Sequence, residues 1–358
     1  MKVVTVVGNR PQFVKAAAVS MTLREHGDEV LVHTGQHYDD ELSAVFFAEL
    51  GVPPPALELR LGTGSNTEQT ARMLSALAPV LAEERPDCVL VYGDTNSTLA
   101  GGLAAAQAQL PVAHVEAGMR SFDRAMPEEL NRVLTDHLAS LLLCSSAAAA
   151  AHLRAERIAG RVEVVGDVMV DVALLVQPRA RQDDVPLRAA GVRAGEYVLA
   201  TAHRAGNVDD PARLRRLVEL LMALPVPVVL PLHPRTGARL EAAGLLDGLL
   251  SADHVRVTPP LGYLAFTALL TRAAVMLTDS GGVQKEAYLA GVPCVTLRDT
   301  TEWRETVDAG WNVLVDLDAD AALAALARPV PTERPPLYGD GQAGGRVVDA
   351  LLTAFGGR

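Results

Sequence analysis

The sequence predicts two doubly wound α/β domains in one chain of 358 residues. Short apolar runs recur along it with helical stretches between them, the pattern of buried parallel strands joined by helices. A charged segment with two prolines, 177–190, interrupts this alternation, which then starts again. The chain is also long enough for each of two domains to bury its own core. We therefore expect a first domain at 1–176, a linker at 177–190 and a second domain at 191–340, with a helix at 341–358 that packs back on the first.

Eleven apolar runs mark the expected strands in order, because each is continuous rather than alternating, as in a strand covered on both faces. Six precede the linker: KVVTVV (2–7), EVLVHT (29–34), DCVLVY (87–92), PVAHVE (111–116), LLLC (141–144) and VEVV (162–165). Five follow it: EYVLATA (196–202), VPVVLPL (226–232), HVRV (254–257), AVMLT (274–278) and PCVTL (293–297).

The composition excludes several classes of protein. A net charge of -11 gives no electrostatic reason to bind nucleic acid or an anionic membrane. No apolar stretch has spanning length without polar residues, and no segment resembles a signal peptide. The three cysteines lie in or beside apolar runs, which is typical of reduced core residues, so we expect a cytoplasmic protein.

Polar residues gather directly after the expected strands. In open parallel sheets, ligands bind outside the carboxyl ends of the strands, so two such domains predict a cleft between them. Several ligand-binding motifs are absent: the sequence has no G-x-G-x-x-G after its first strand, no P-loop, no His-Glu-x-x-His and no Cys-x-x-Cys. We expect no cofactor and no metal.

In the first domain, the candidates follow three strands. Arg10 and Lys15 lie at the entrance to the first helix, where a phosphate would meet two cations and free amides; two solvated surface cations are the alternative. Asp94 is either a reactive carboxylate or a helix N-cap. Glu116 precedes Ala-Gly, where the backbone can turn sharply. Glu128, like its neighbour Glu129, lies in a first helical turn, where the helix dipole favours a carboxylate regardless of function.

In the second domain, His203 and His233 end two strands, and each is either a site residue or a structural histidine. The stretch TDSGGVQKE, 278–286, follows another strand and should open a helix. Gly281 and Gly282 lack Cβ atoms, so backbone amides can approach an oxyanion closely, and Ser280 adds a hydroxyl. Glu286 lies one turn further, within reach of sugar hydroxyls. A glycine-softened turn without a ligand is the alternative.

The order of these motifs resembles the non-hydrolysing UDP-N-acetylglucosamine 2-epimerases. The resemblance runs from residue 3 to about 315 and rests on G-x-RP-x-x-x-K (8–15), TGQHYD (34–39), GDTNSTLAG (93–101), HVEAGMRS (114–121), PEELNRVLTDH (127–137), HR (203–204), LTDSGGVQKEA (277–287) and RDTTEW (298–303). It implies two Rossmann-like domains in the glycosyltransferase-B arrangement, a UDP-sugar as ligand, no cofactor and a homodimer.

The resemblance also implies the reaction and the residues. UDP would be eliminated from UDP-N-acetylglucosamine to give 2-acetamidoglucal, and then added back with the C2 proton on the other face, giving UDP-N-acetylmannosamine. The implied catalytic residues are Asp94, Glu116, Glu128 and His203. The implied substrate-binding residues are Arg10, Lys15, Phe266, Ser280, Gly281, Gly282 and Glu286. Some members are activated by substrate at a second site, which would involve Gln36, His37, Gln69 and His233.

Two departures from the family pattern bear on the substrate. The first motif is GNRPQ where many members have GTRPE, and Trp303 stands where many have an arginine after TTE. This combination is similar to a branch that includes epimerases acting on UDP-2,3-diacetamido-2,3-dideoxyglucuronate, so that sugar is an alternative substrate. A glycosyltransferase of the same fold, a hydrolysing epimerase and a non-catalytic nucleotide-sugar sensor are the alternative functions.

Overall fold

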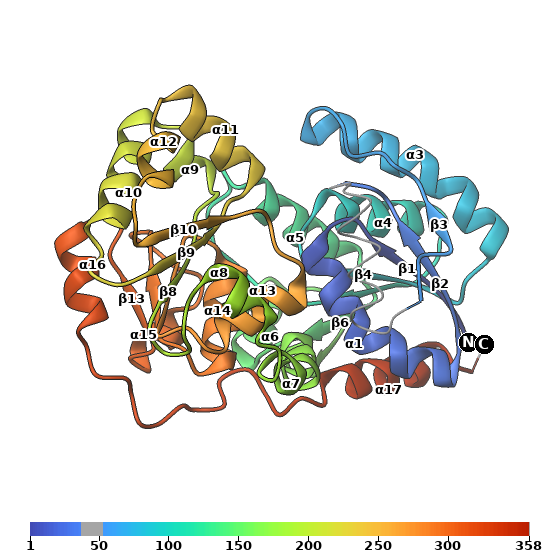
Figure 1. Cartoon of the computed structure of the whole chain (residues 1–358). Coiled ribbons are helices and arrows are strands. Elements are labelled where there is room, and N and C mark those ends of the chain that lie inside the picture. The colour runs from blue at the N-terminus through green and yellow to red at the C-terminus, as the bar shows by residue number, and fades with distance from the viewer. Residues whose placement is uncertain (37–52, 358) are drawn as a thin grey trace. The chain divides into compact units, whose positions relative to one another are not determined.

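The computed structural model describes residues 1–36 and 53–357, and its chain forms two compact units (Figure 1). Met1–Leu174 and Tyr338–Arg358 make up the first unit, and Leu175–Leu337 make up the second. The change from the first unit to the second falls inside helix α7, Val168–Ala180.

The first unit is built on a parallel sheet of seven strands in the described residues, in the order β3-β2-β1-β4-β5-β6-β7. The order reverses direction between β1 and β4, which is the doubly wound arrangement. The strands are β1 (Lys2–Val7), β2 (Asp28–His33), β3 (Leu57–Glu58), β4 (Cys88–Tyr92), β5 (Val112–Val115), β6 (Leu141–Cys144) and β7 (Arg161–Val164). The helices are α1 (Arg10–His26), α3 (Asn66–Glu84), α4 (Asn96–Gln107), α5 (Pro127–Leu138), α6 (Ala147–Ala155), most of α7, and α17 (Ala343–Phe355).

The second unit repeats this plan with a parallel sheet in the order β10-β9-β8-β11-β12-β13. Its strands are β8 (Val198–Thr201), β9 (Val228–Pro231), β10 (Val255–Thr258), β11 (Val275–Thr278), β12 (Cys294–Thr296) and β13 (Asn312–Leu314). Its helices are α8 (Val185–Ala190), α9 (Ala205–Val208), α10 (Pro211–Ala223), α11 (Pro234–Ala242), α12 (Leu246–Leu250), α13 (Tyr263–Leu270), α14 (Gly281–Ala290), α15 (Arg304–Asp308) and α16 (Ala319–Leu326). Two doubly wound parallel sheets are thus confirmed.

All eleven predicted strands are present, with ends shifted by at most two residues. The sequence did not reveal β3 and β13, which have two and three residues and are only partly buried. Between the predicted domains, 177–190 is mostly helical, since α7 runs to Ala180 and α8 begins at Val185.

The last helix, α17, belongs to the first unit, where it lies beside α1 (Figure 1). Its buried face consists mainly of apolar residues, among them Val347, Val348, Leu351 and Phe355. At its beginning, the Asp171 carboxylate accepts hydrogen bonds from the amides of Ala343 and Gly344. The chain therefore returns to the first unit after completing the second.

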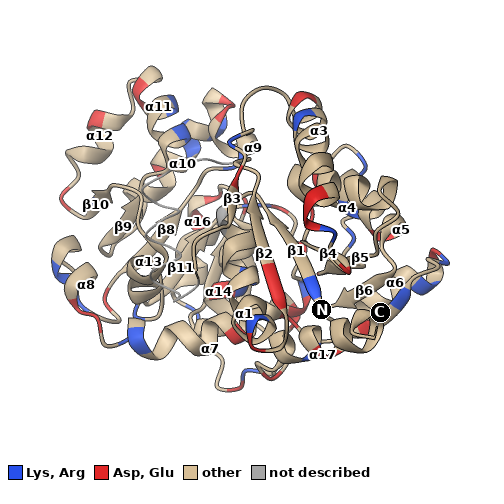
Figure 2. Ribbon diagram, turned by 90° about the vertical axis from the view of Figure 1, so that its right-hand side faces the viewer, with Lys and Arg blue, Asp and Glu red and all other residues tan. Residues whose placement is uncertain are grey.

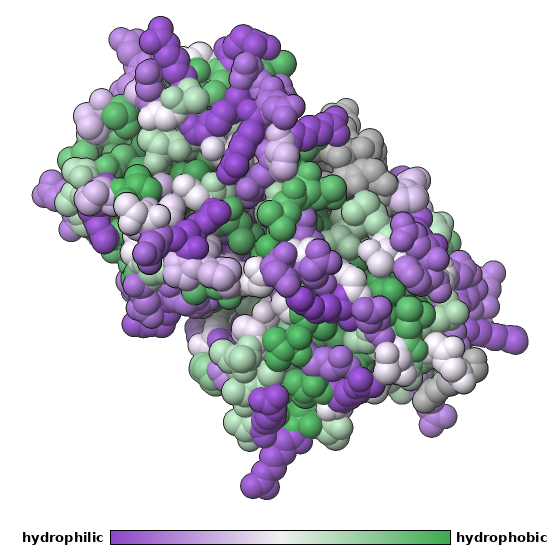
Figure 3. Space-filling view, turned by 90° about the horizontal axis from the view of Figure 1, so that it is seen from below, coloured by the Kyte–Doolittle hydropathy of each residue, from purple (hydrophilic) through white to green (hydrophobic). Residues whose placement is uncertain are grey.

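Each unit has its own apolar core on its sheet, in which the three cysteines are buried. Burial raises the pKa of the thiols of Cys88, Cys144 and Cys294 to about 12. Basic and acidic residues are interspersed along the ribbon in Figure 2. The face in Figure 3 likewise mixes hydrophilic and hydrophobic side chains. No helix among the described residues is long and apolar enough to cross a bilayer.

Candidate active site

Three loops of the first unit meet because the strands before them are neighbours in the sheet. Strand β4 pairs with β1 on one side and with β5 on the other, all in parallel. Their carboxyl ends therefore lie at one edge, and the loops after them carry Asp94 and Glu116, with Lys15 on the first helix. Arg10 is the first residue of α1.

Glu116 forms an ion pair with Lys15 across 101 residues of sequence. The carboxylate is almost fully buried, and the residue has a φ of 67°. A non-glycine residue in this left-handed region costs free energy, and such outliers cluster at functional sites. Gly93 lies beside the pair, since a Cβ there would be 3.3 Å from Glu116 Oε2 and 3.4 Å from Lys15 Nζ. The geometry thus holds a buried carboxylate against an ammonium at the end of β5.

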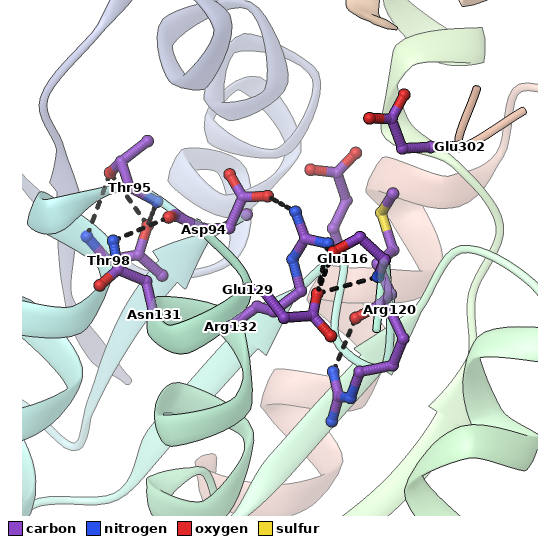
Figure 4. Close-up of polar contacts among 12 residues, drawn as sticks. Asp94, Thr95, Thr98, Glu116, Arg120, Glu129, Asn131, Arg132 and Glu302 are labelled. Carbon is purple, nitrogen blue, oxygen red and sulfur yellow. Dashed lines mark hydrogen bonds and ion pairs between the residues drawn. The ribbon is translucent and has the colours of Figure 1, made fainter. Parts of the chain in front are cut away.

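Asp94 pairs with Arg132 of α5, and the same guanidinium also contacts Glu129 (Figure 4). The N-cap of α4 is Thr95, with a reciprocal capping box to Thr98, so Asp94 is not the cap. The cap interpretation of Asp94 is therefore wrong. Its side chain is left to interact with the cation on α5.

The two glutamates of the first turn of α5 have different surroundings. Glu128 is exposed, whereas Glu129 is buried and accepts hydrogen bonds from Ser121 N and Oγ, Phe122 N and Arg132 Nη1 at 2.9 to 3.0 Å. Burial alone would raise the pKa of Glu129, but these donors lower it below the ordinary value. Glu129 thus anchors the loop before α5 and one side of Arg132, a role that the sequence did not reveal.

Gln12 stands where many members of the family have the glutamate of GTRPE, and its contacts give the glutamine a structural role. Its Oε1 accepts from Gly8 N, and its Nε2 donates to Tyr92 O at 2.7 Å and to Thr98 Oγ1 at 2.9 Å. An ionised glutamate could not donate these two bonds. The glutamine therefore ties the loop after β1 to the end of β4.

A second buried network, centred on His114 and Asp136, contacts the loops that carry Asp94 and Glu116. His114 Nε2 lies 2.7 Å from the carbonyl of Gly93, and Nδ1 lies 2.7 Å from Asp136 Oδ1. Asp136 also accepts from Gly118 N and Arg120. Burial would raise the pKa of Asp136, but the donors on His114 and Arg120 lower it. Sequence reasoning missed this network, because its members are 16 to 22 residues apart.

Two of the predicted regulatory residues contact the beginning of α4. Gln36 Oε1 accepts from the amide and hydroxyl of Ser97 at 3.0 and 2.8 Å. Gln69 Oε1 accepts from Asn96 Nδ2 at 3.2 Å. His37 lies outside the described residues. A regulatory role for any of them stays a prediction.

In the second unit, the predicted phosphate cradle opens α14 directly after β11. Ser280 is the N-cap but makes no side-chain capping bond to the helix, and Gly282 is exposed. The first amides of a helix have no partner within it and carry partial positive charge. A Cβ at Gly282 would meet no atom closer than Ser280 Oγ, at 4.0 Å, so the fold itself does not require glycine there.

The two predicted histidines of this unit are neighbours, with ring centroids 5.4 Å apart. Buried Asp279 fixes the first of them: its carboxylate accepts from the amides of His203 and Arg204 at 3.0 to 3.1 Å and from Asn207 Nδ2 at 3.2 Å. His233 caps α11, since its Nδ1 accepts from Arg235 N.

The other predicted binding residues of the second unit differ in exposure. Phe266 lies in the core cluster and is 9% exposed. Glu286, on α14, is half-buried. Among the described residues, no group of three or more His, Cys, Asp or Glu side chains is placed to hold a metal ion.

The segment 298–303 packs on the beginning of α14. Glu302 forms two hydrogen bonds with Arg298 and lies 3.6 Å from Arg204 Nη2. Burial would raise the pKa of Glu302, but Arg298 lowers it. Trp303 donates its indole N–H to Gly281 O at 2.7 Å.

The fold and these groups define a class of enzyme when they are combined with comparisons to known proteins. A family profile described as UDP-N-acetylglucosamine 2-epimerase matches residues 20–352. The chain therefore belongs to the UDP-N-acetylglucosamine 2-epimerase family, and it is a nucleotide-sugar 2-epimerase, an isomerase.

Two similar epimerases and one more distant protein of the same fold can be compared with this chain. A UDP-2,3-diacetamido-2,3-dideoxy-D-glucuronate 2-epimerase of Pseudomonas aeruginosa is 46% identical, over 98% of this chain and 99% of its own. The crystal structure of Methanocaldococcus jannaschii UDP-GlcNAc 2-epimerase in complex with UDP-GlcNAc and UDP matches with a TM-score of 0.91 at 39% identity, over 99% and 100% of the two chains. A sucrose-phosphate synthase from Thermosynechococcus elongatus, at 15% identity and a TM-score of 0.60 over 99% and 96%, shares the fold alone, the glycosyltransferase-B type.

Proposed function

We propose that the chain interconverts UDP-N-acetylglucosamine and UDP-N-acetylmannosamine by anti elimination of UDP and its re-addition. The observation that carries this proposal is the pair of carboxylates after β4 and β5, Asp94 and Glu116, each paired with a cation in the first unit. A carboxylate can accept a proton as a general base and return one as a general acid, which is what epimerisation at C2 requires.

The chemistry requires two proton transfers at C2. In the first step, a carboxylate removes the C2 proton, the electron pair forms the C1=C2 bond, and the C1–O bond breaks so that UDP leaves with its electrons. In the second step, UDP oxygen attacks C1 while a protonated carboxyl group delivers a proton to the opposite face of C2. One group gains a proton and the other loses one, so proton exchange with solvent restores the starting state.

The second unit supports the other half of the reaction, which is retention of UDP. The uncapped amides of α14 and the exposed Gly282 suit a diphosphate, and Glu286 suits the ribose hydroxyls. His203, whose backbone is fixed by Asp279, is assigned to the diphosphate. Arg10 and Lys15 are also assigned to the phosphates, and Glu128 and Phe266 remain further site residues of the proposal.

A second substrate has a specific observation in its favour. The Pseudomonas aeruginosa relative named for UDP-2,3-diacetamido-2,3-dideoxyglucuronate is 46% identical, against 40% for the Methanocaldococcus jannaschii UDP-N-acetylglucosamine 2-epimerase. The chemistry at C1 and C2 would be the same for both sugars. The ratio of kcat/KM for the two nucleotide sugars decides between them.

The test is incubation of the protein with UDP-N-acetylglucosamine in deuterated water, followed by NMR. We expect UDP-N-acetylmannosamine with deuterium at C2, because the returned proton comes from solvent. Unexchanged substrate or free sugar as the product would contradict the proposal, and sugar transfer to an acceptor would indicate a glycosyltransferase. The diacetamido uronic acid nucleotide is tested in parallel.

Variants of the two carboxylates sharpen this test. Asp94→Asn and Glu116→Gln should each lower turnover by about 100-fold or more, the range for loss of a general acid or base. Glu83→Gln, at an exposed glutamate of α3, is the matched control and should retain full activity. Wild-type turnover in both carboxylate variants would remove these residues from the mechanism.

A further inference from the structure

We propose that Trp303 is a positioning residue for the diphosphate of the bound UDP-sugar, because it fixes the direction of the Gly282 N–H at the beginning of α14. The inference rests on the proposed function, in which this helix end holds the diphosphate. It gives a role to the tryptophan that stands where many family members have an arginine.

The first observation is the hydrogen bond from Trp303 Nε1 to Gly281 O, at 2.7 Å. Gly281 is the first residue of α14. A carbonyl oxygen has two lone pairs, so one in the first helical turn can accept an indole N–H besides its bond within the helix. The indole thus holds the peptide unit that joins Gly281 to Gly282.

That peptide unit couples the bond to the ligand site. The described chain has no cis peptide bond, and in a trans peptide the C=O and the following N–H point in opposite directions. Fixing the carbonyl of Gly281 therefore fixes the amide of Gly282, one of the helix amides without an intrahelical partner. Two adjacent glycines are otherwise the most mobile backbone that a chain can have, so the bond organises the donor before an anion arrives.

The second observation is a further contact between Trp303 and the same helix. The ammonium of Lys285, a residue only 2% exposed, lies 4.6 Å from the centroid of the indole ring. Such a cation–π contact stabilises a desolvated ammonium. Trp303 therefore holds α14 at its first carbonyl and again at Lys285, one turn further along.

The packing around Gly281 supports the same role. A Cβ at Gly281 would lie 3.2 Å from Glu302 Oε2 and 3.5 Å from Trp303 Nε1. Residues 302 and 303 therefore pack directly on this glycine. The indole N–H already donates to Gly281, so the tryptophan acts through the helix and not through its own bond to the nucleotide.

Titration calorimetry with UDP tests the proposal. Trp303→Phe keeps an aromatic ring but removes the N–H, so the Kd for UDP should rise about fivefold, the equivalent of one ordinary hydrogen bond. The matched control is Trp311→Phe, which removes the other tryptophan, whose Nε1 donates to Glu333 O at 2.8 Å away from the beginning of α14. The control should bind UDP as the wild type does.

A fluorescence titration leaves Trp303 intact and so remains informative if Trp303→Phe does not fold. In Trp311→Phe, Trp303 is the single tryptophan, and its emission should change on saturation with UDP, whereas Trp303→Phe should give no change. Equal Kd values for Trp303→Phe and wild type, or equal weakening in both variants, would overturn the inference. The inference would also be overturned if the fluorescence emission of Trp303 did not change when UDP is added. A wild-type protein that binds no UDP would instead overturn the proposed function, and the inference with it.

Discussion

At the scale of single residues, the carboxylates of the first unit differ in what surrounds them. Asp94 pairs with Arg132 and Glu116 pairs with Lys15, whereas Asp136 and Glu129 each accept several hydrogen bonds. Several fixed donors stabilise the ionised form of a carboxylate and so disfavour its uptake of a proton. Asp136 and Glu129 therefore suit a positioning role, and proton transfer by Asp94 and Glu116 is part of the proposed function.

Asp136 links this electrostatic arrangement to stability. Its pKa lies below the ordinary 3.8, because His114 and Arg120 outweigh the effect of burial. The stability that Asp136 contributes is therefore fully present above pH 3.8 and is lost as the pH falls through the lower folded-state pKa. We expect Asp136→Asn to lower the free energy of unfolding by about 3 kcal/mol at pH 7, since it breaks a buried pair.

Urea denaturation between pH 2.5 and 7 measures this. The difference between variant and wild type should shrink as the pH falls below 3.8, while Asp349→Asn, at an exposed aspartate of α17 in the same unit, should match the wild type throughout. If the difference in the free energy of unfolding stays constant with pH, the negative charge of Asp136 does not contribute to stability.

At the scale of elements, α14 shows a glycine without a structural reason. Gly282 has no positive φ, and a Cβ there would meet no atom closer than Ser280 Oγ at 4.0 Å, so replacement by alanine should not strain the fold. Alanine also favours helix by up to about 1 kcal/mol. In the proposed function, the missing Cβ of Gly282 leaves room for the diphosphate to come close to the backbone.

Gly282→Ala should therefore retain or raise the free energy of unfolding while it weakens UDP binding by about tenfold or more, the loss of one bond to a charged group. Denaturation and calorimetry on the same sample measure both. Gly345→Ala, at a helical glycine of α17 with nothing within 4 Å, is the control and should change only stability. Undiminished UDP affinity in Gly282→Ala would place the diphosphate elsewhere.

The elements themselves could be predicted from sequence far better than the contacts that organise the site. Continuous apolar runs located eleven strands, because burial on both faces is a local signal. Arg132 and Asp279 gave no such signal, since their partners lie 38 and about 75 residues away and only the folded chain brings them together. Trp303 appeared in the sequence as a missing arginine, and only the structure showed what its indole contacts.

At the scale of the whole molecule, helix α17 completes the first unit although it follows the second unit in the sequence. Because α17 packs against α1, the first unit is incomplete until residues 343–355 have been synthesised. The large buried apolar side chains of α17, Val347, Val348, Leu351 and Phe355, contribute about 1.5 to 3 kcal/mol each. That sum is a large share of the stability of an ordinary domain.

Leu351→Ala should lower the free energy of unfolding by about 3 kcal/mol through a cavity between α17 and the unit. Leu352→Ala, at the half-buried neighbouring position, is the control and should cost less. Removal of residues 338–358 should leave a first unit that does not fold stably. Chemical denaturation monitored by circular dichroism measures all three, and an unaffected truncation would contradict the assignment of α17 to the first unit.

The three buried cysteines make the chain a convenient host for spectroscopic probes. Thiolates are the reactive form of cysteine, and with thiol pKa values near 12 almost none forms at neutral pH. A cysteine introduced at the surface of either unit would then be the single thiol to take a maleimide dye or a nitroxide label. Two such labels, one on each unit, would report the separation of the units in solution as UDP is added, without first replacing a native residue.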